Sequence, residues 1–179
     1  MRLKSRIPEP SDRGGSSSTR KKVIVRLPGS SPIKGYLNPS TLGQSLEVDL
    51  LTPEGEHLSI RLAGAKCIYF VREFDEPFEP ERKSYLARPK LDGLWVRLHF
   101  QDGEEIEGIV ANDLLDIHDT GLQVTPPGLH GNTLRMFVPR AALTEVKVLG
   151  VIGAARRTSR DTRGTTEHPA GTQSKLFDE

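Results

Sequence analysis

The sequence is poor in several residue types, and each shortage excludes a class of protein. It contains one cysteine, so neither an internal disulfide framework nor a Cys-rich zinc site is expected. No apolar run approaches the roughly 20 residues that cross a bilayer, and the N-terminus has no apolar signal core. The net charge is +1, which excludes a uniformly basic nucleic-acid binder. We therefore expect a cytoplasmic protein that does not bind a membrane.

Catalytic patterns are missing as well. The five histidines form no pair at metal-ligand spacing. There is no Gly-x-Ser-x-Gly, no Gly-x-Gly-x-x-Gly and no phosphate-binding loop. Cys67 lies in an apolar segment and fits an inert core thiol better than a nucleophile. The sequence predicts a protein that is not an enzyme and that holds neither a metal nor a cofactor.

The two ends differ in composition from the middle. Residues 1–22 and 151–179 have few large apolar side chains, so we expect both to be disordered. Residues 1–22 carry about +5, and residues 93–150 carry about −4. Because an acidic surface repels phosphate backbones, the folded part favours a protein partner over nucleic acid.

The middle of the chain predicts an all-β fold. Short apolar or alternating segments are separated by turn residues, as in Thr52-Pro53-Glu54-Gly55-Glu56 and Gln101-Asp102-Gly103-Glu104. The predicted strands are 23–27, 33–37, 46–51, 57–62, 67–71, 94–100, 105–110, 120–124, 135–139 and 144–149. The last five repeat the pattern of the first five. We predict two tandem small five-stranded Sm/SH3-like barrels, 23–74 and 93–150, joined by a linker at 75–92.

Two pairs of residues stand out within the predicted strands. Gly35 and Gly108 recur at the same place in each unit, where a glycine would permit the sharp bend of a small barrel, so we assign them a structural role. Trp95 and Phe100 share one strand at odd spacing and must face opposite sides. An exposed aromatic there would stack a base or anchor a partner, and the alternative is that the neighbouring unit covers it.

Part of the second unit resembles a known fold. Val96-Arg97-Leu98, Asp102-Gly103, Gly108 and Phe137-Val138-Pro139 together resemble the signatures of the Sm-like barrel, the fold of the Sm, Lsm and Hfq proteins. The resemblance implies RNA binding and a homo-oligomer. Open strand edges of small barrels would provide the contacts for such an assembly.

A second resemblance points to a nucleotide ligand. Asp116-Ile117-His118-Asp119-Thr120-Gly121 is similar to the Asp-x-Ser-x-x-Gly motif of PilZ domains, which bind cyclic di-GMP. PilZ domains also carry an arginine pair before the barrel, where this chain has Arg82 and Arg88. The resemblance implies a ligand site formed by Arg82, Arg88, Asp116 and Gly121.

The whole middle of the chain also resembles an uncharacterised bacterial domain family of unknown function. Gly93-Leu94-Trp95-Val96-Arg97 and Val138-Pro139-Arg140-Ala141-Ala142-Leu143 carry this resemblance. It implies no activity. From the missing catalytic groups and the acidic second unit we predict a non-catalytic binding or regulatory module whose partner is a protein. An RNA-binding Sm-like protein and a PilZ-like cyclic di-GMP sensor are the alternatives.

Overall fold

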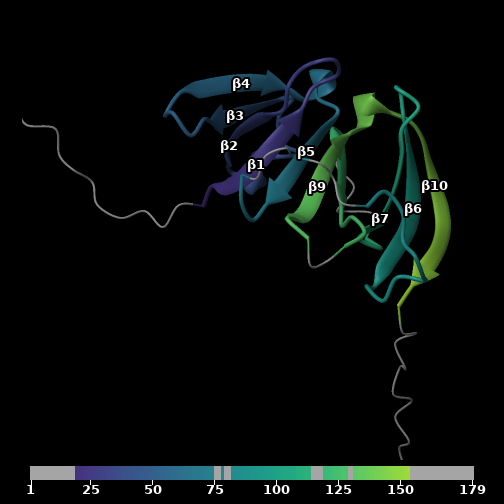
Figure 1. The fold of residues 1–179 in the computed structure, drawn as a ribbon. Helices are drawn as coiled ribbons and strands as arrows, with labels where there is room; N and C mark the ends of the chain where they lie inside the picture. Colours follow the sequence, from purple (N-terminus) through teal and green to yellow (C-terminus); the bar gives the residue numbers. More distant parts are fainter. Residues whose placement is uncertain (1–18, 75–77, 79–81, 114–118, 129–130, 154–179) are drawn as a thin grey trace, which may run out of the picture.

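The computed structural model describes residues 19–74, 78, 82–113, 119–128 and 131–153 (Figure 1). Its regular elements are strands and single 3-10 turns, so the all-β prediction is confirmed. The strands are β1 (Lys21–Arg26), β2 (Ile33–Leu37), β3 (Glu47–Leu51), β4 (His57–Arg61), β5 (Cys67–Val71), β6 (Gly93–Phe100), β7 (Glu105–Val110), β8 (Gly121–Val124), β9 (Thr133–Pro139) and β10 (Leu143–Ile152). In the described residues, no helix is long and apolar enough to cross a membrane.

The strands form two antiparallel sheets. One has seven strands in the order β4-β3-β2-β1-β5-β9-β8, and the other has three in the order β10-β6-β7. Figure 1 shows the first five strands on one side, β6, β7 and β10 on the other, and β9 between them. Among the described residues, an isolated antiparallel bridge between Ile109 and Thr125 connects the two sheets. We call β1–β5 the first half and β6–β10 the second half.

The prediction of two separate five-stranded barrels is not confirmed. Strand β9 of the second half pairs with β5 of the first half, in a register that places Ile68 opposite Phe137, so one sheet runs through both halves. Neither sheet closes into a barrel in the part of the chain that the structure describes. The physical reason lies in β5, since all five of its residues are buried and its side chains are apolar on both faces. A strand of this kind needs cover on each face and a partner on each edge.

The expected repeat is visible in the pairing of the strands. Val23 stands between Gly35 on one side and Phe70 on the other, and Val96 stands between Gly108 and Val148 in the same way. In both halves a 3-10 turn joins the fourth strand to the fifth, η2 (Leu62–Gly64) and η4 (Arg140–Ala142). Strands β5 and β10 therefore hold equivalent places, as do β4 and β9.

Two apolar cores hold the halves together, and each takes side chains from the other half. Phe137, from β9, lies in the core of the first half with Ile68 and Phe70. Cys67 and Tyr69, from β5, lie in the core of the second half. Each core therefore contains side chains from both halves, so the packing of the two halves is linked.

Gly35 and Gly108 are required by close contact between strands. A Cβ atom on Gly35 would lie 2.6 Å from Leu50 Cγ, and one on Gly108 would lie 2.1 Å from Val124 Cγ1. The glycines thus let β3 and β8 pack closely against β2 and β7. The sequence prediction gave a different reason, a sharp bend of the strand.

The boundaries of the fold differ slightly from the predicted ones. β1 begins at Lys21, inside the predicted leader, and β10 continues to Ile152, inside the predicted tail. Residues 1–18 and 154–179 lie outside the described residues.

Candidate functional site

The three-stranded sheet has one apolar and one polar face. Along β6, Val96, Leu98 and Phe100 are buried in the second core, which we call the inner face. Trp95, Arg97 and His99 alternate with them on the outer face. The predicted opposite orientation of Trp95 and Phe100 is therefore what the structure shows.

Neither aromatic of β6 is an open stacking platform. Phe100 is 2% exposed. Trp95 lies against Tyr85, with ring centroids 6.3 Å apart and an interplanar angle of 85°, and its Nε1 donates to Glu107 Oε2 at 3.2 Å. Tyr85 comes from the linker, and its hydroxyl donates to the carbonyl of Thr125 at 3.1 Å. The linker thus covers part of Trp95, whereas the sequence-based alternative assigned this cover to the neighbouring unit.

Glu107 fixes this linker to the sheet. Its carboxylate accepts from Arg97 Nη2 at 2.9 Å, from the backbone N–H of Tyr85 at 3.1 Å and from Trp95. Its own N–H donates to the carbonyl of Lys83 at 2.6 Å. Burial alone would raise the pKa of Glu107, but these hydrogen bonds outweigh it and the pKa lies below its usual value. This buried carboxylate is consequently a structural anchor that is ionised at neutral pH.

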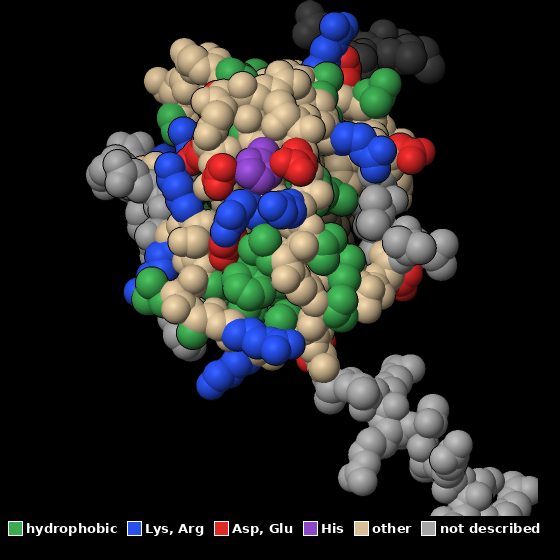
Figure 2. All heavy atoms as spheres, turned by 90° about the vertical axis from the view of Figure 1, so that its right-hand side faces the viewer, with side chains coloured by type: hydrophobic (Ala, Val, Ile, Leu, Met, Phe, Trp, Pro, Cys, Tyr) green, Lys and Arg blue, Asp and Glu red, His purple; other side chains and the backbone are tan. Residues whose placement is uncertain are grey.

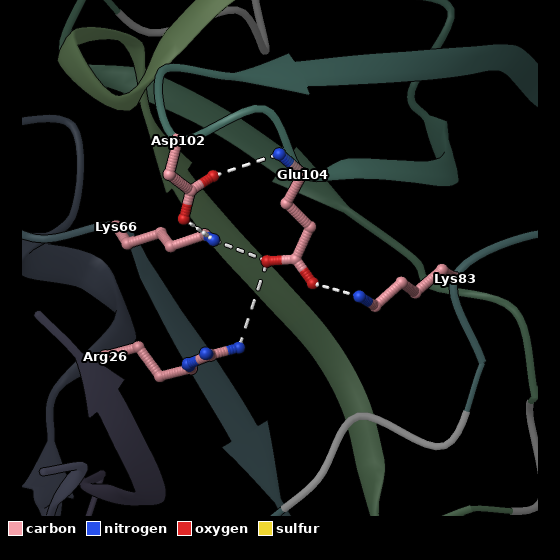
Figure 3. A network of polar contacts seen from close by, with 5 residues as sticks. All are labelled: Arg26, Lys66, Lys83, Asp102 and Glu104. Atoms are coloured by element: carbon pink, nitrogen blue, oxygen red, sulfur yellow. Dashed lines mark hydrogen bonds and ion pairs between the residues drawn. The ribbon is translucent and has the colours of Figure 1, made fainter. Parts of the chain in front are cut away.

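A second polar network joins the two halves (Figure 3). The Lys66 side chain, 8% exposed, binds the carboxylates of Asp102 and Glu104. Glu104 Oε1 also lies 2.7 Å from Lys83 Nζ, and its Oε2 lies 4.0 Å from Arg26 Nη1. The ammonium of Lys66 stands 5.1 Å from the centre of the Phe100 ring, a cation–π contact. The network links the first half, the linker and the second half.

The predicted turn at Asp102-Gly103 positions both acids of this network. Gly103 adopts φ 82°, and the N–H of Phe100 donates to the carbonyl of Glu104 at 2.9 Å, which closes the hairpin. The hydrogen bond from Lys66 lowers the pKa of Asp102 below its usual value. Burial would raise the pKa of Glu104, but Lys66 and Lys83 together lower it. Lys66 is the cation among the described residues that line the pocket of about 250 Å³ beside it, and it is already bound to two carboxylates.

The residues of the predicted nucleotide site are only partly placed. Arg82 and Arg88 are exposed on the linker, and Arg88 Nη2 donates to the carbonyl of Val151 at 3.4 Å. Gly121 is buried in β8, where an added Cβ would lie 2.7 Å from Cζ of Phe137. Asp116 lies outside the described residues. Glycine is required at this position because a Cβ would collide with the carbonyl oxygen of Val138, at 2.5 Å, as well as with the Phe137 ring.

Catalytic groups do not gather among the residues that the structure covers. No cluster of three or more His, Cys, Asp or Glu residues suits a metal there. Burial raises the pKa of the Cys67 thiol to about 12, so the thiolate that a nucleophile needs is not formed at neutral pH.

Strand β10 carries three of the exposed large apolar residues of the described part of the chain. It is ten residues long and lies at the end of the three-stranded sheet, and no other strand in the described ranges pairs with its edge away from β6. We call this the free edge of β10. Val146, Val148 and Val151 are 41%, 55% and 60% exposed. Sequence reasoning missed this site, because the same alternating residues also suit a strand with partners on both edges.

Around β10, the surface combines charged and apolar side chains. His99 Nδ1 lies 3.2 Å from Glu105 Oε1, and its Nε2 lies 3.7 Å from Glu145 Oε2. Figure 2, which views the molecule from the side that carries β10, shows a histidine between two acidic side chains, basic side chains next to it and a hydrophobic group below. A long unpaired strand edge with such a surface can add a further strand through main-chain hydrogen bonds.

The family of the chain is shown by a match over most of its length. The model of a family described as a family of unknown function (DUF6982) matches residues 19–150. No curated protein and no solved structure matches the chain. The expected kinship with an uncharacterised domain family is confirmed, whereas the Sm-like and PilZ-like similarities are not shown. This chain belongs to the family of unknown function DUF6982.

Proposed function

We propose that this protein is a non-catalytic binding module that recognises a protein partner by adding an extended segment of that partner to β10. The observation that carries the proposal is the free edge of β10, with its three exposed valines. Main-chain N–H and C=O groups along such an edge provide affinity, and side-chain contacts on alternate positions provide specificity.

The rest of the fold supports a recognition role by attaching this sheet to the linker and to the first half. Glu107 ties the linker to β6 and β7, and the network around Lys66 ties β6 to the first half. The buried Cys67 thiol supports a role without catalysis. A regulatory role in the cytoplasm, and Sm-like or SH3-like kinship of the two halves, belong to the same proposal.

The proposal is tested by comparing the proteins that full-length variants retain from a host extract. Val148→Lys places a charge on the free edge, which disfavours strand addition, and Leu86→Lys makes the same kind of change on a residue of the linker that is 85% exposed. We expect Val148→Lys to lose a partner that wild type and Leu86→Lys both retain. Equal retention by all three proteins would contradict the proposal.

The same experiment separates the two alternatives. If nuclease treatment removes the bound material, RNA binding replaces protein binding as the conclusion. Calorimetry with cyclic di-GMP should show no heat at tens of micromolar protein, an order-of-magnitude choice for a micromolar ligand. Heat that disappears in Arg82→Ala and Arg88→Ala would favour the nucleotide site instead.

A further inference from the structure

The regular part of β10 is short and has defined faces. Register shifts between Leu143 and Glu145 and between Val148 and Gly150 mark bulges, so the undistorted ladder runs from Glu145 to Val148. Val146 and Val148 stand opposite Leu98 and Val96 and therefore lie on the inner face. Glu145 and Lys147, opposite His99 and Arg97, lie on the outer face.

This stretch has opposite charges two residues apart on one face, which is the arrangement that an antiparallel copy of itself would match. Two copies that pair through β10 are related by a two-fold axis perpendicular to the sheet, so each face continues across the junction. Residues directly opposite each other must then share a face. The two-fold axis must therefore pass through a residue of β10 and not between two residues, so possible registers differ by moving the axis from one residue to the next.

One register satisfies the charges, and its neighbours do not. With the axis at Val146, each Glu145 stands opposite Lys147 of the second copy, and Val146 stands opposite itself. Moving the axis to Lys147 places two ammonium groups opposite each other, and moving it to Glu145 places two carboxylates opposite each other. Like charges directly opposite destabilise a strand pair, and opposite charges stabilise it.

We propose that the occupant of the free edge is a second copy of this chain, paired antiparallel through β10 about Val146. This inference rests on the proposed function, strand addition at β10, and names the partner as the protein itself. The interface is isologous and closed, so it produces a dimer rather than a filament. Since only two strands meet, we expect association to be weak and dependent on concentration.

The alternative way to join copies repeats the contact already present between the halves. Because β10 is equivalent to β5 and β4 to β9, copies could pair β10 with β4 of the next molecule. In this β10–β4 pair, Ser59 of β4 would stand at the position that Phe137 of β9 has in the β5–β9 pair. Lys147 of β10 would stand at the position that Tyr69 has in β5. The aromatic that fills the first core would be replaced by a hydroxyl, and an ammonium would replace a buried ring, so this arrangement is disfavoured.

Charge exchange tests the dimer. Sedimentation velocity of the full chain over a range of concentrations should show a monomer–dimer equilibrium. Glu145→Lys and Lys147→Glu each replace two attractive pairs by two repulsive ones and should weaken the dimer about tenfold or more. The double variant Glu145→Lys/Lys147→Glu restores opposite charges and should recover the wild-type affinity, while Leu86→Lys should leave it unchanged.

The outcomes distinguish this inference from the proposed function. A wild-type chain that stays monomeric at all concentrations, or a dimer that neither single variant weakens, overturns the second copy as the occupant. If the chain is monomeric but Val148→Lys still loses a different protein from the extract, strand addition at β10 stands and the self-pairing fails. If Val148→Lys changes neither self-association nor partner retention, both proposals fail.

Discussion

Phe137, in β9 of the second half, stands opposite Ile68, in β5 of the first half, and its side chain lies in the core of the first half. The residue is fully buried. Gly121 lies directly beside its ring, where a larger residue would collide with it. One aromatic side chain thus couples the packing of both halves.

Replacing Phe137 should therefore destabilise the whole fold. We expect Phe137→Ala to lower the free energy of unfolding by about 4 kcal/mol, since it removes a buried ring and leaves a cavity. Hydrogen exchange should show lost protection in β1 and β5 as well as in β9. Leu134→Ala, at a residue of β9 that is 45% exposed, provides the control and should change stability little. If protection is lost in the second half alone, the coupling is wrong.

Lys66 should be the most important member of the ionic network. Lys66→Met leaves the carboxylates of Asp102 and Glu104 close together without their buried cation, so we expect a loss of about 3 kcal/mol in the free energy of unfolding. Lys83→Met removes a more exposed partner of the same Glu104 carboxylate and should cost less than about 1 kcal/mol. Urea denaturation measures both, and equal losses would contradict the ranking.

Acid should destabilise the protein through the same carboxylates. The pKa values of Asp102, Glu104 and Glu107 are lower in the folded chain than in ordinary side chains. The unfolded chain therefore binds more protons in acid than the folded chain does. The three carboxylates stabilise the fold fully above the ordinary glutamate pKa of 4.5, and this stabilisation is lost as the pH falls through their lowered pKa values in the folded chain.

Urea denaturation between neutral pH and pH 3, about one and a half units below the ordinary glutamate value, measures this dependence. We expect a smaller loss of stability with acid in Lys66→Met than in wild type, because the cation that lowers the two pKa values of the network is gone. An identical pH dependence in both proteins would show that the network does not set the acid sensitivity.

Gly108 should tolerate no side chain. In Gly108→Ala the new Cβ would overlap with Val124 Cγ1, so β7 and β8 must move apart, and we expect a loss of about 2 kcal/mol or more. Gly64→Ala is the matched control, since a Cβ added to Gly64 would meet no atom within 4 Å, and this variant should change stability little. Thermal unfolding of the two variants compares them directly, and equal losses would show that the contact with Val124 does not matter.

Much of the local structure could be predicted from the sequence. Alternating apolar residues and the turns at Thr52–Glu56 and Gln101–Glu104 placed all ten strands, because these signals act between residues that are neighbours in the chain. The structural role predicted for Gly35 and Gly108 was based on a bend of the strand, whereas the structure shows close contact with a neighbouring strand at both positions.

The pairing of the halves could not be predicted in the same way. The residues of a strand do not specify which strand pairs with each of its edges, so the pairing of β5 with β9 could not be predicted from the sequence of β5. The signal was present in Cys67–Val71, whose side chains are apolar on both faces. A strand at the margin of a separate barrel would expose one of those faces.

The candidate sites depend on contacts between distant residues. Lys66 and Asp102 are 36 positions apart, so their pairing follows from the fold and not from spacing. The valines of β10 follow the pattern of an ordinary strand, and only the sheet order shows that no described strand covers that edge.

The insertion of β9 beside β5 also affects how the chain folds as it is made. Synthesis delivers β1 to β5 first, yet Cys67–Val71 has no partner on its second edge until β9 has left the ribosome. During synthesis, the apolar strand β5 therefore has an unpaired edge until β9 emerges. A chaperone that shields this strand until β9 emerges would therefore raise the yield of correctly folded protein.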